Sequence, residues 1–169
     1  VSITDLQAAL DMGRGTLYYY FKDKDDLFQE VVDTFLIRPK QRALERVKET
    51  ANIAEMIEAM LYYLKQLQEF YNMVENKNIN TSNVVNVMYT AYSRFPELYK
   101  KARKMYELEL TLWTQAIKNS MRAGEIRGDV SIDTTAHMFL HIKDGWDPGR
   151  TGAPMNFEIF PEQYNYLYS

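Results

Sequence analysis

The chain has 169 residues, 46% hydrophobic and 25% charged, which excludes a disordered protein and allows a sizeable buried core. The absence of cysteine excludes disulfides and thiol chemistry, and no apolar run is long enough to span a bilayer. The net charge of −3 gives no support for nucleic-acid binding, and no secretory leader pattern opens the sequence, so composition favours a cytoplasmic protein.

Two short helices joined by a tight turn are predicted at the start of the chain. Ser2 is a good N-cap for a helix over 3–10, residues 11–13 form the turn, and a second helix covers 14–21. Two helices separated by three residues are typical of a helix-turn-helix, whose second helix enters the major groove of DNA.

The following segment predicts two longer helices. Asp23 can cap the first, and Pro39 is expected to kink or end it because proline lacks the amide hydrogen that a helix interior needs. Asn52 and Glu55 have the spacing of a capping box, which marks the start of the second helix. The polar, asparagine-rich segment 72–83 is predicted to be a loop.

The C-terminal half predicts four more helices. Their expected ranges are 82–92, 96–122, 131–144 and 157–168, with Gly124 as the stop of the second and a loop at 146–156. The predicted fold is therefore all-α, with a helix-turn-helix unit over 1–22 and a larger helical domain over 23–169.

Hydrogen-bond donors on the second motif helix are candidates for DNA contact. Arg14, Thr16 and Tyr19 are expected at base edges. Tyr18 and Lys24 are expected at phosphates, where the backbone amides at a helix start would assist Lys24. The alternative is that both helices belong to an ordinary core. The predicted DNA-binding residues are Ser2, Thr4, Gly13, Arg14, Thr16, Tyr18, Tyr19 and Lys24.

The segment SITDLQAALDMGRGTLYYYFKDKDDLF resembles the DNA-binding signature of the TetR family of bacterial transcriptional regulators, and GTLYYYFKDKDDL is its most specific part. The later segment RAGEIRGDVSIDTTAHMFLHIKDGW is similar, more loosely, to the start of that family's dimerisation helix. Asp11 stands where the family usually has glycine, Gly13 where it often has a serine cap, and the family's first helix is absent.

The resemblance implies a ligand-responsive regulator, a repressor by expectation, that binds a palindromic operator in double-stranded DNA. It implies a homodimer through about 132–145 and 157–169, and an inducer site in the larger domain. One alternative is a DNA-bound interaction protein of the same fold with no small-molecule inducer. Another is a helical carrier or enzyme that does not bind DNA.

Thirteen tyrosines and nine methionines are many for this length, and several lie on the helices after Asn52. Such side chains suit a pocket for a small apolar or aromatic ligand, although the same spacing is also typical of plain core. The candidate pocket residues are Met56, Met60, Tyr63, Tyr89, Tyr92, Tyr106 and Trp113.

One helix face carries a possible metal-binding pattern, formed by Asp133, His137, His141 and Asp144. A polar stripe at an interface or pocket wall explains the same spacing, so no metal and no cofactor are predicted. The chain has no nucleophile elbow, no phosphate-binding glycine loop and no H-E-x-x-H motif, which argues against an enzyme.

Overall fold

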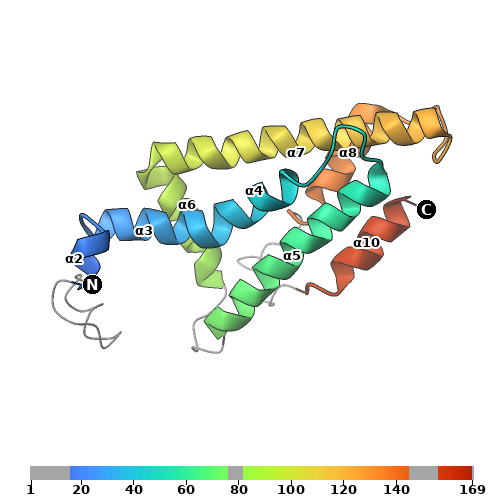
Figure 1. The fold of residues 1–169 in the computed structure, drawn as a ribbon. Coiled ribbons are helices and arrows are strands. Elements are labelled where there is room, and N and C mark those ends of the chain that lie inside the picture. Colours follow the sequence, from blue (N-terminus) through green and yellow to red (C-terminus); the bar gives the residue numbers. More distant parts are fainter. Residues whose placement is uncertain (1–15, 76–81, 145–155, 169) are drawn as a thin grey trace.

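The computed structural model describes residues 16–75, 82–144 and 156–168 (Figure 1). These parts of the chain contain helices and no strand, so the fold is all-α, as the sequence predicts. None of their helices is long and apolar enough to cross a membrane. The elements are α2 (Thr16–Tyr20), α3 (Lys24–Val32), the π-helical turn η1 (Asp33–Ile37), α4 (Arg38–Leu44), α5 (Ile53–Glu75), α6 (Ser82–Arg94), α7 (Pro96–Ala123), α8 (Ile132–His141) and α10 (Ile159–Tyr168).

Helix α7 is the longest element, and the rod formed by α3, η1 and α4 runs alongside it (Figure 1). Helix α5 lies below that rod in Figure 1, with α10 beside it. Helix α6 packs against both α3 of the rod and α7. Helix α2 lies at one end of the molecule, and the chain ends near the other. The small N-terminal helix is thus presented away from the main body.

Three aromatic rings stack on one another at the end of the molecule opposite α2. Trp113 of α7 stacks on Phe139 of α8 at 4.7 Å between ring centroids and on Tyr164 of α10 at 5.9 Å. All three side chains are buried in the main hydrophobic core. Aromatic rings bury large apolar areas, so this stack fixes α8 and α10 against α7.

The helix ends confirm the predicted caps. The carboxylate of Asp23 accepts two backbone N–H bonds at 2.9 Å, and Asn52 and Glu55 bond to one another's backbone amides as a capping box requires. Gly124 ends α7 with φ of 72°, a left-handed conformation that favours glycine. Ser131 caps α8 by accepting the amide of the third residue beyond it.

Several expected element ends differ from the structure. Pro39 does not end the helical structure, because the wide turn η1 precedes it and places the proline in the first turn of α4, where its missing N–H costs nothing. Helix α5 continues to Glu75, since Tyr71 stays buried at helical spacing from Leu67 while Asn72 and Met73 after it are exposed. The remaining part of that predicted loop, 76–81, lies outside the described residues.

Helix α8 ends at His141, three residues before the expected end of its helix. The final helix begins at Ile159, and its proline lies in the first turn, as a helix start allows. The first predicted helix, 3–10, the motif turn, 11–13, and most of the predicted loop at 146–156 lie outside the described residues.

Candidate functional site

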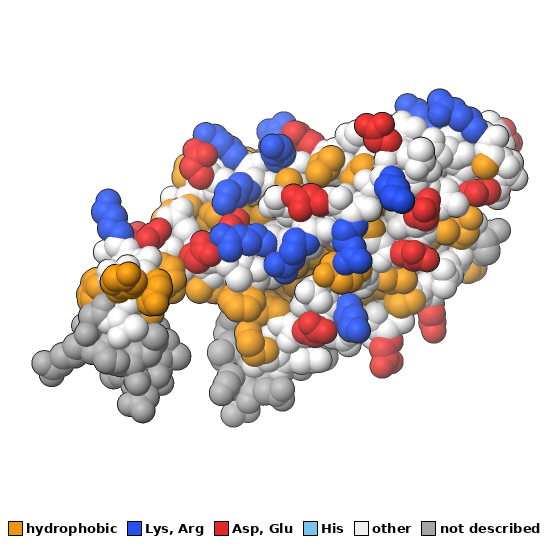
Figure 2. All heavy atoms as spheres, in the orientation of Figure 1, with side chains coloured by type: hydrophobic (Ala, Val, Ile, Leu, Met, Phe, Trp, Pro, Cys, Tyr) orange, Lys and Arg blue, Asp and Glu red, His pale blue; other side chains and the backbone are white. Residues whose placement is uncertain are grey.

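Helix α2 exposes three consecutive tyrosines, Tyr18, Tyr19 and Tyr20. Hydrophobic side chains are visible on the surface at this end of the described chain (Figure 2). The one buried side chain of α2, Leu17, is 5% exposed, whereas Tyr18 is 56% and Tyr19 is 84% exposed. The rings of Tyr19 and Tyr20 meet edge to face at 5.0 Å. A leucine anchor under a row of phenol groups leaves hydroxyl donors free to contact a surface outside the chain.

Lys24 is exposed and is the first residue of α3, next to the predicted DNA-reading helix. The amides of Asp25 and Asp26 already bond to the Asp23 carboxylate. The help that these two amides are predicted to give Lys24 at a phosphate is therefore reduced, and the ammonium group of Lys24 remains the candidate donor.

Of the other predicted DNA-contact residues, Thr16 lies within the described part of the chain. Thr16 is half-buried at the start of α2. Ser2, Thr4, Gly13 and Arg14 lie outside the described residues, so their placement stays a prediction.

A latch joins the start of α3 to the corner between α6 and α7. Nη2 of Arg94, the last residue of α6, lies 3.0 Å from each carboxylate oxygen of Asp25. Next to it, the rings of Phe28 and Phe95 pack at 5.8 Å. Helix α6 thus contacts the start of α3, close to α2, and it also lines the cavity described below.

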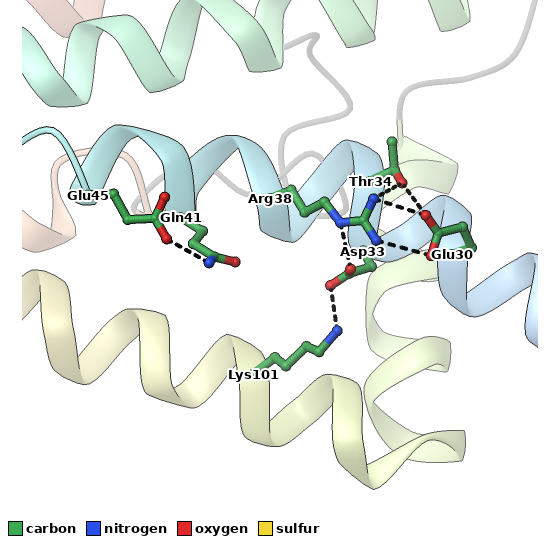
Figure 3. A network of polar contacts seen from close by, with 7 residues as sticks. All are labelled: Glu30, Asp33, Thr34, Arg38, Gln41, Glu45 and Lys101. Carbon is green, nitrogen blue, oxygen red and sulfur yellow. Dashed lines mark hydrogen bonds and ion pairs between the residues drawn. The ribbon is translucent and has the colours of Figure 1, made fainter.

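Figure 3 shows the polar network that braces η1. The buried carboxylate of Asp33 accepts hydrogen bonds from Arg38 Nε at 2.9 Å and from Lys101 Nζ of α7 at 3.1 Å. Arg38 also donates to Thr34 and Glu30, one and two turns back toward α3. The network joins the rod to α7 at η1, where the helical pitch of the rod changes.

A cavity of about 470 Å³ lies among the rod, α5, α6 and α7, within the size range of small-molecule sites. Of the predicted pocket residues, Tyr63, Tyr89, Tyr92 and Tyr106 line it. Met56, Met60 and Trp113 are fully buried in the core and do not line it. Neighbouring helices cover these three side chains instead.

One wall of the cavity is charged. Lys40 of α4 and Lys143, just after α8, both line it, and both hold the carboxylate of Glu109 on α7, which is 0% exposed. The distances are 2.5 Å from Lys40 Nζ to Oε2 and 3.1 Å from Lys143 Nζ to Oε1. Lys143 also lies 3.3 Å from Asp144, a half-exposed residue of the same wall.

The ionisation of this cluster follows from burial and charge together. Burial alone would raise the pKa of Glu109, but Lys143 and Lys40 outweigh it, so the pKa is lowered and the carboxylate stays charged. Burial, with help from Lys143, lowers the pKa of Lys40 despite the attraction of Glu109. Burial also raises the pKa values of Tyr63 and Tyr92, whose hydroxyls therefore remain donors at neutral pH.

The four residues of the possible metal pattern do not converge. The His137 and His141 rings are 5.7 Å apart, and Nδ1 of His137 is bonded to the Asp133 carbonyl at 2.9 Å. Asp144 pairs with Lys143 in the cavity wall. The described residues contain no group of three or more side chains placed to hold a metal ion.

The charged wall was not predicted from the sequence. Its signal was Glu109 in a row with Met105 and Trp113, four residues to either side on the buried face of α7. A carboxylate in such an apolar row must have partners, because a lone buried charge is too costly. Neither lysine could be assigned to it from spacing, since both come from other elements.

Comparison with known proteins links the chain to bacterial regulators. A sequence profile of the bacterial regulatory proteins of the tetR family matches residues 1–31. The uncharacterized HTH-type transcriptional regulator YhgD of Bacillus subtilis (strain 168) is 31% identical over 161 residues, which cover 91% of this chain and 77% of that protein. A second uncharacterized HTH-type transcriptional regulator of that organism, YvaF, is 39% identical over 75 residues, 43% of this chain and 38% of that protein. No solved structure matches the chain significantly.

Proposed function

Because the chain belongs to the TetR family of bacterial regulatory proteins, we propose that it is a cytoplasmic homodimeric repressor that leaves its DNA operator when a small molecule fills the cavity. The observation that carries the proposal is the exposed tyrosine face of α2, which falls inside the segment that matches the family. A helix anchored by one buried residue and exposed on its other sides is suited to a DNA groove.

In the proposed complex, two copies of α2 read half-sites about 34 Å apart, one turn of B-form DNA. Tyr18 and Lys24 contact phosphates and position the helix, while Thr16 and Tyr19 approach base edges. Lysine and tyrosine contacts with phosphate add affinity without sequence preference, so the base-edge residues carry specificity.

The proposed dimer forms through about 132–145 and 157–169, away from α2. In support, α8 and α10 expose Met138, Ile159 and Tyr166 to solvent in the single chain. Exposed apolar side chains on neighbouring helices are typical of a face that another helix pair covers.

The proposed response links the cavity to α3 by two routes. Helix α6 lines the cavity and grips Asp25 through Arg94, and α4 lines it and continues through η1 into α3. A ligand that prefers one arrangement of these helices shifts the spacing of the two reading helices by as much as its affinities for the two states differ. The cavity favours this function over a regulator of the same fold that binds only a protein.

The test is operator binding by the full-length protein, with a site found by footprinting of its upstream region. The variant Tyr18→Phe with Lys24→Ala should bind about ten-fold or more weakly, and its salt dependence should fall by about one charge. The matched control, Tyr99→Phe with Lys118→Ala, removes the same groups from other exposed positions and should bind normally. Equal affinity of all three proteins at matched salt would remove α2 as the contact surface, and no protected site would overturn the function.

A further inference from the structure

The cavity has one charged corner in an otherwise apolar and aromatic lining. Leu36, Leu67, Val84 and Met88 are among its apolar residues, and the tyrosines add hydroxyl groups. The charged corner is made by Lys40, Lys143 and Asp144, with Glu109 buried behind the two lysines. The site therefore has a long apolar part and a single polar end.

The buried charges at this corner do not balance. Two ammonium groups, 16% and 7% exposed, share the one fully buried carboxylate of Glu109. Asp144 brings a second negative charge near Lys143, but its side chain is 50% exposed and water screens part of that charge. Lys143 also donates to the Leu140 carbonyl at 3.0 Å, a neutral acceptor that adds no charge.

The side of the corner that faces the cavity is consequently positive. A cation placed there would meet two ammonium groups before it reached Glu109. An anion would complete the pairing of both lysines, and the protonated hydroxyl of Tyr63 lines the same cavity as a further donor.

The volume limits the size of the occupant. A cavity of about 470 Å³ lies in the lower half of the roughly 300–1,000 Å³ range of small-molecule sites. A carboxylate with a tail of roughly ten carbons fits this space, and the apolar lining matches the tail.

We propose that the cavity binds an amphipathic anion, with its carboxylate between Lys40 and Lys143 and its apolar body against α5 and α6. The inference names the ligand class of the regulator proposed above and rests on that function for its biological meaning. The binding itself is independent of DNA.

The experiment compares three probes with the same alkyl chain: decanoate, 1-decanol and decylammonium, each titrated into the full chain by calorimetry below its micelle concentration. Decanoate should bind roughly 10- to 100-fold more tightly than decanol, the range expected for a hydrogen bond to a charged group, and decylammonium should bind most weakly. Equal or tighter binding of either competitor, or no binding of decanoate, would overturn the proposal.

Substitutions at the corner locate the head group. Lys143→Met should weaken decanoate binding by about ten-fold while leaving decanol unchanged, and Lys118→Met, at an exposed position of α7, should change neither. If Lys143→Met does not fold, Asp144→Asn decides, because loss of this half-exposed negative charge should tighten decanoate binding several-fold. Weaker binding of decanoate to Asp144→Asn would refute an anionic ligand.

Operator binding in the presence of decanoate separates the two proposals. Decanoate that binds at the corner but leaves operator affinity unchanged supports the anion site and contradicts the ligand response. Failure of decanoate to bind, with a protected operator still present, overturns the anion site alone.

Discussion

Replacing Glu109 with glutamine should be among the most damaging single changes to the stability of this fold. The carboxylate is fully buried and holds two ammonium groups, so the variant leaves both lysines facing a neutral amide. Removing one partner from a buried ion pair costs about 3–5 kcal/mol, a large part of the 5–15 kcal/mol by which domains are stable.

The matched control lies two residues away on the same helix. Glu107 pairs with Arg103 one turn earlier, and both side chains are mostly exposed. Exposed pairs of this kind contribute about 0.3–0.5 kcal/mol, so Glu107→Gln should cost about a tenth as much. Adding Lys143→Met to Glu109→Gln should recover part of the loss, because one unpaired ammonium group is then removed.

Acid titration gives the same reasoning a second readout. The folded pKa of Glu109 lies below its ordinary value of 4.5, so the unfolded chain takes up a proton first as the pH falls. The stabilisation is complete above pH 4.5 and is lost as the pH falls through the folded pKa, by up to about 1.4 kcal/mol per pH unit. In Glu109→Gln this part of the acid slope should disappear.

Urea unfolding at one fixed protein concentration, repeated from pH 7 to pH 3, measures both effects. The reasoning fails if Glu109→Gln costs no more than Glu107→Gln at pH 7. It also fails if the glutamine variant and the native chain lose stability with the same slope below pH 4.5.

Two further predictions concern the connection between the cavity and α2. Arg94→Ala should leave operator affinity within a few-fold but reduce the effect of an inducing ligand, because α6 then loses its ion pair with Asp25. An unchanged response to the ligand in operator titrations would show that this ion pair does not couple the cavity to α2. Asp33→Asn should lower the free energy of unfolding by about 1.5–3 kcal/mol, since Arg38 and Lys101 lose a buried charged acceptor; a loss below 0.5 kcal/mol in urea titrations would show that the brace is unimportant.

Local signals in the sequence predicted much of this fold. Asp23, the Asn52–Glu55 pair and Gly124 each mark a helix end through bonds made within a few residues, so distant parts of the chain hardly affect them. Pro39 misled because its effect depends on the turn before it, and a π-helical turn has no comparable sequence signal.

The cavity was harder to predict for a different reason. Helical spacing shows which side chains point inward, but it does not show whether the space they face is filled. Tyr92 and Trp113 have the same inward pattern, yet one lines the cavity and the other is stacked in the core. Lys40 and Lys143 meet on Glu109 only because three separate elements converge, which no local pattern encodes.

The wide turn η1 also sets the rotational phase between the two halves of the rod. Before it, Phe28 faces the α6–α7 corner; after it, Lys40 faces the cavity, and an Arg38 amide bonded to the Asp33 carbonyl closes the turn. Helix α4 advances about 100° per residue, so inserting one residue between η1 and Lys40 would rotate Lys40 away from Glu109. The number of residues between Phe28 and Lys40, more than three helical turns, therefore sets the orientation of the cavity wall relative to the contact with the α6–α7 corner.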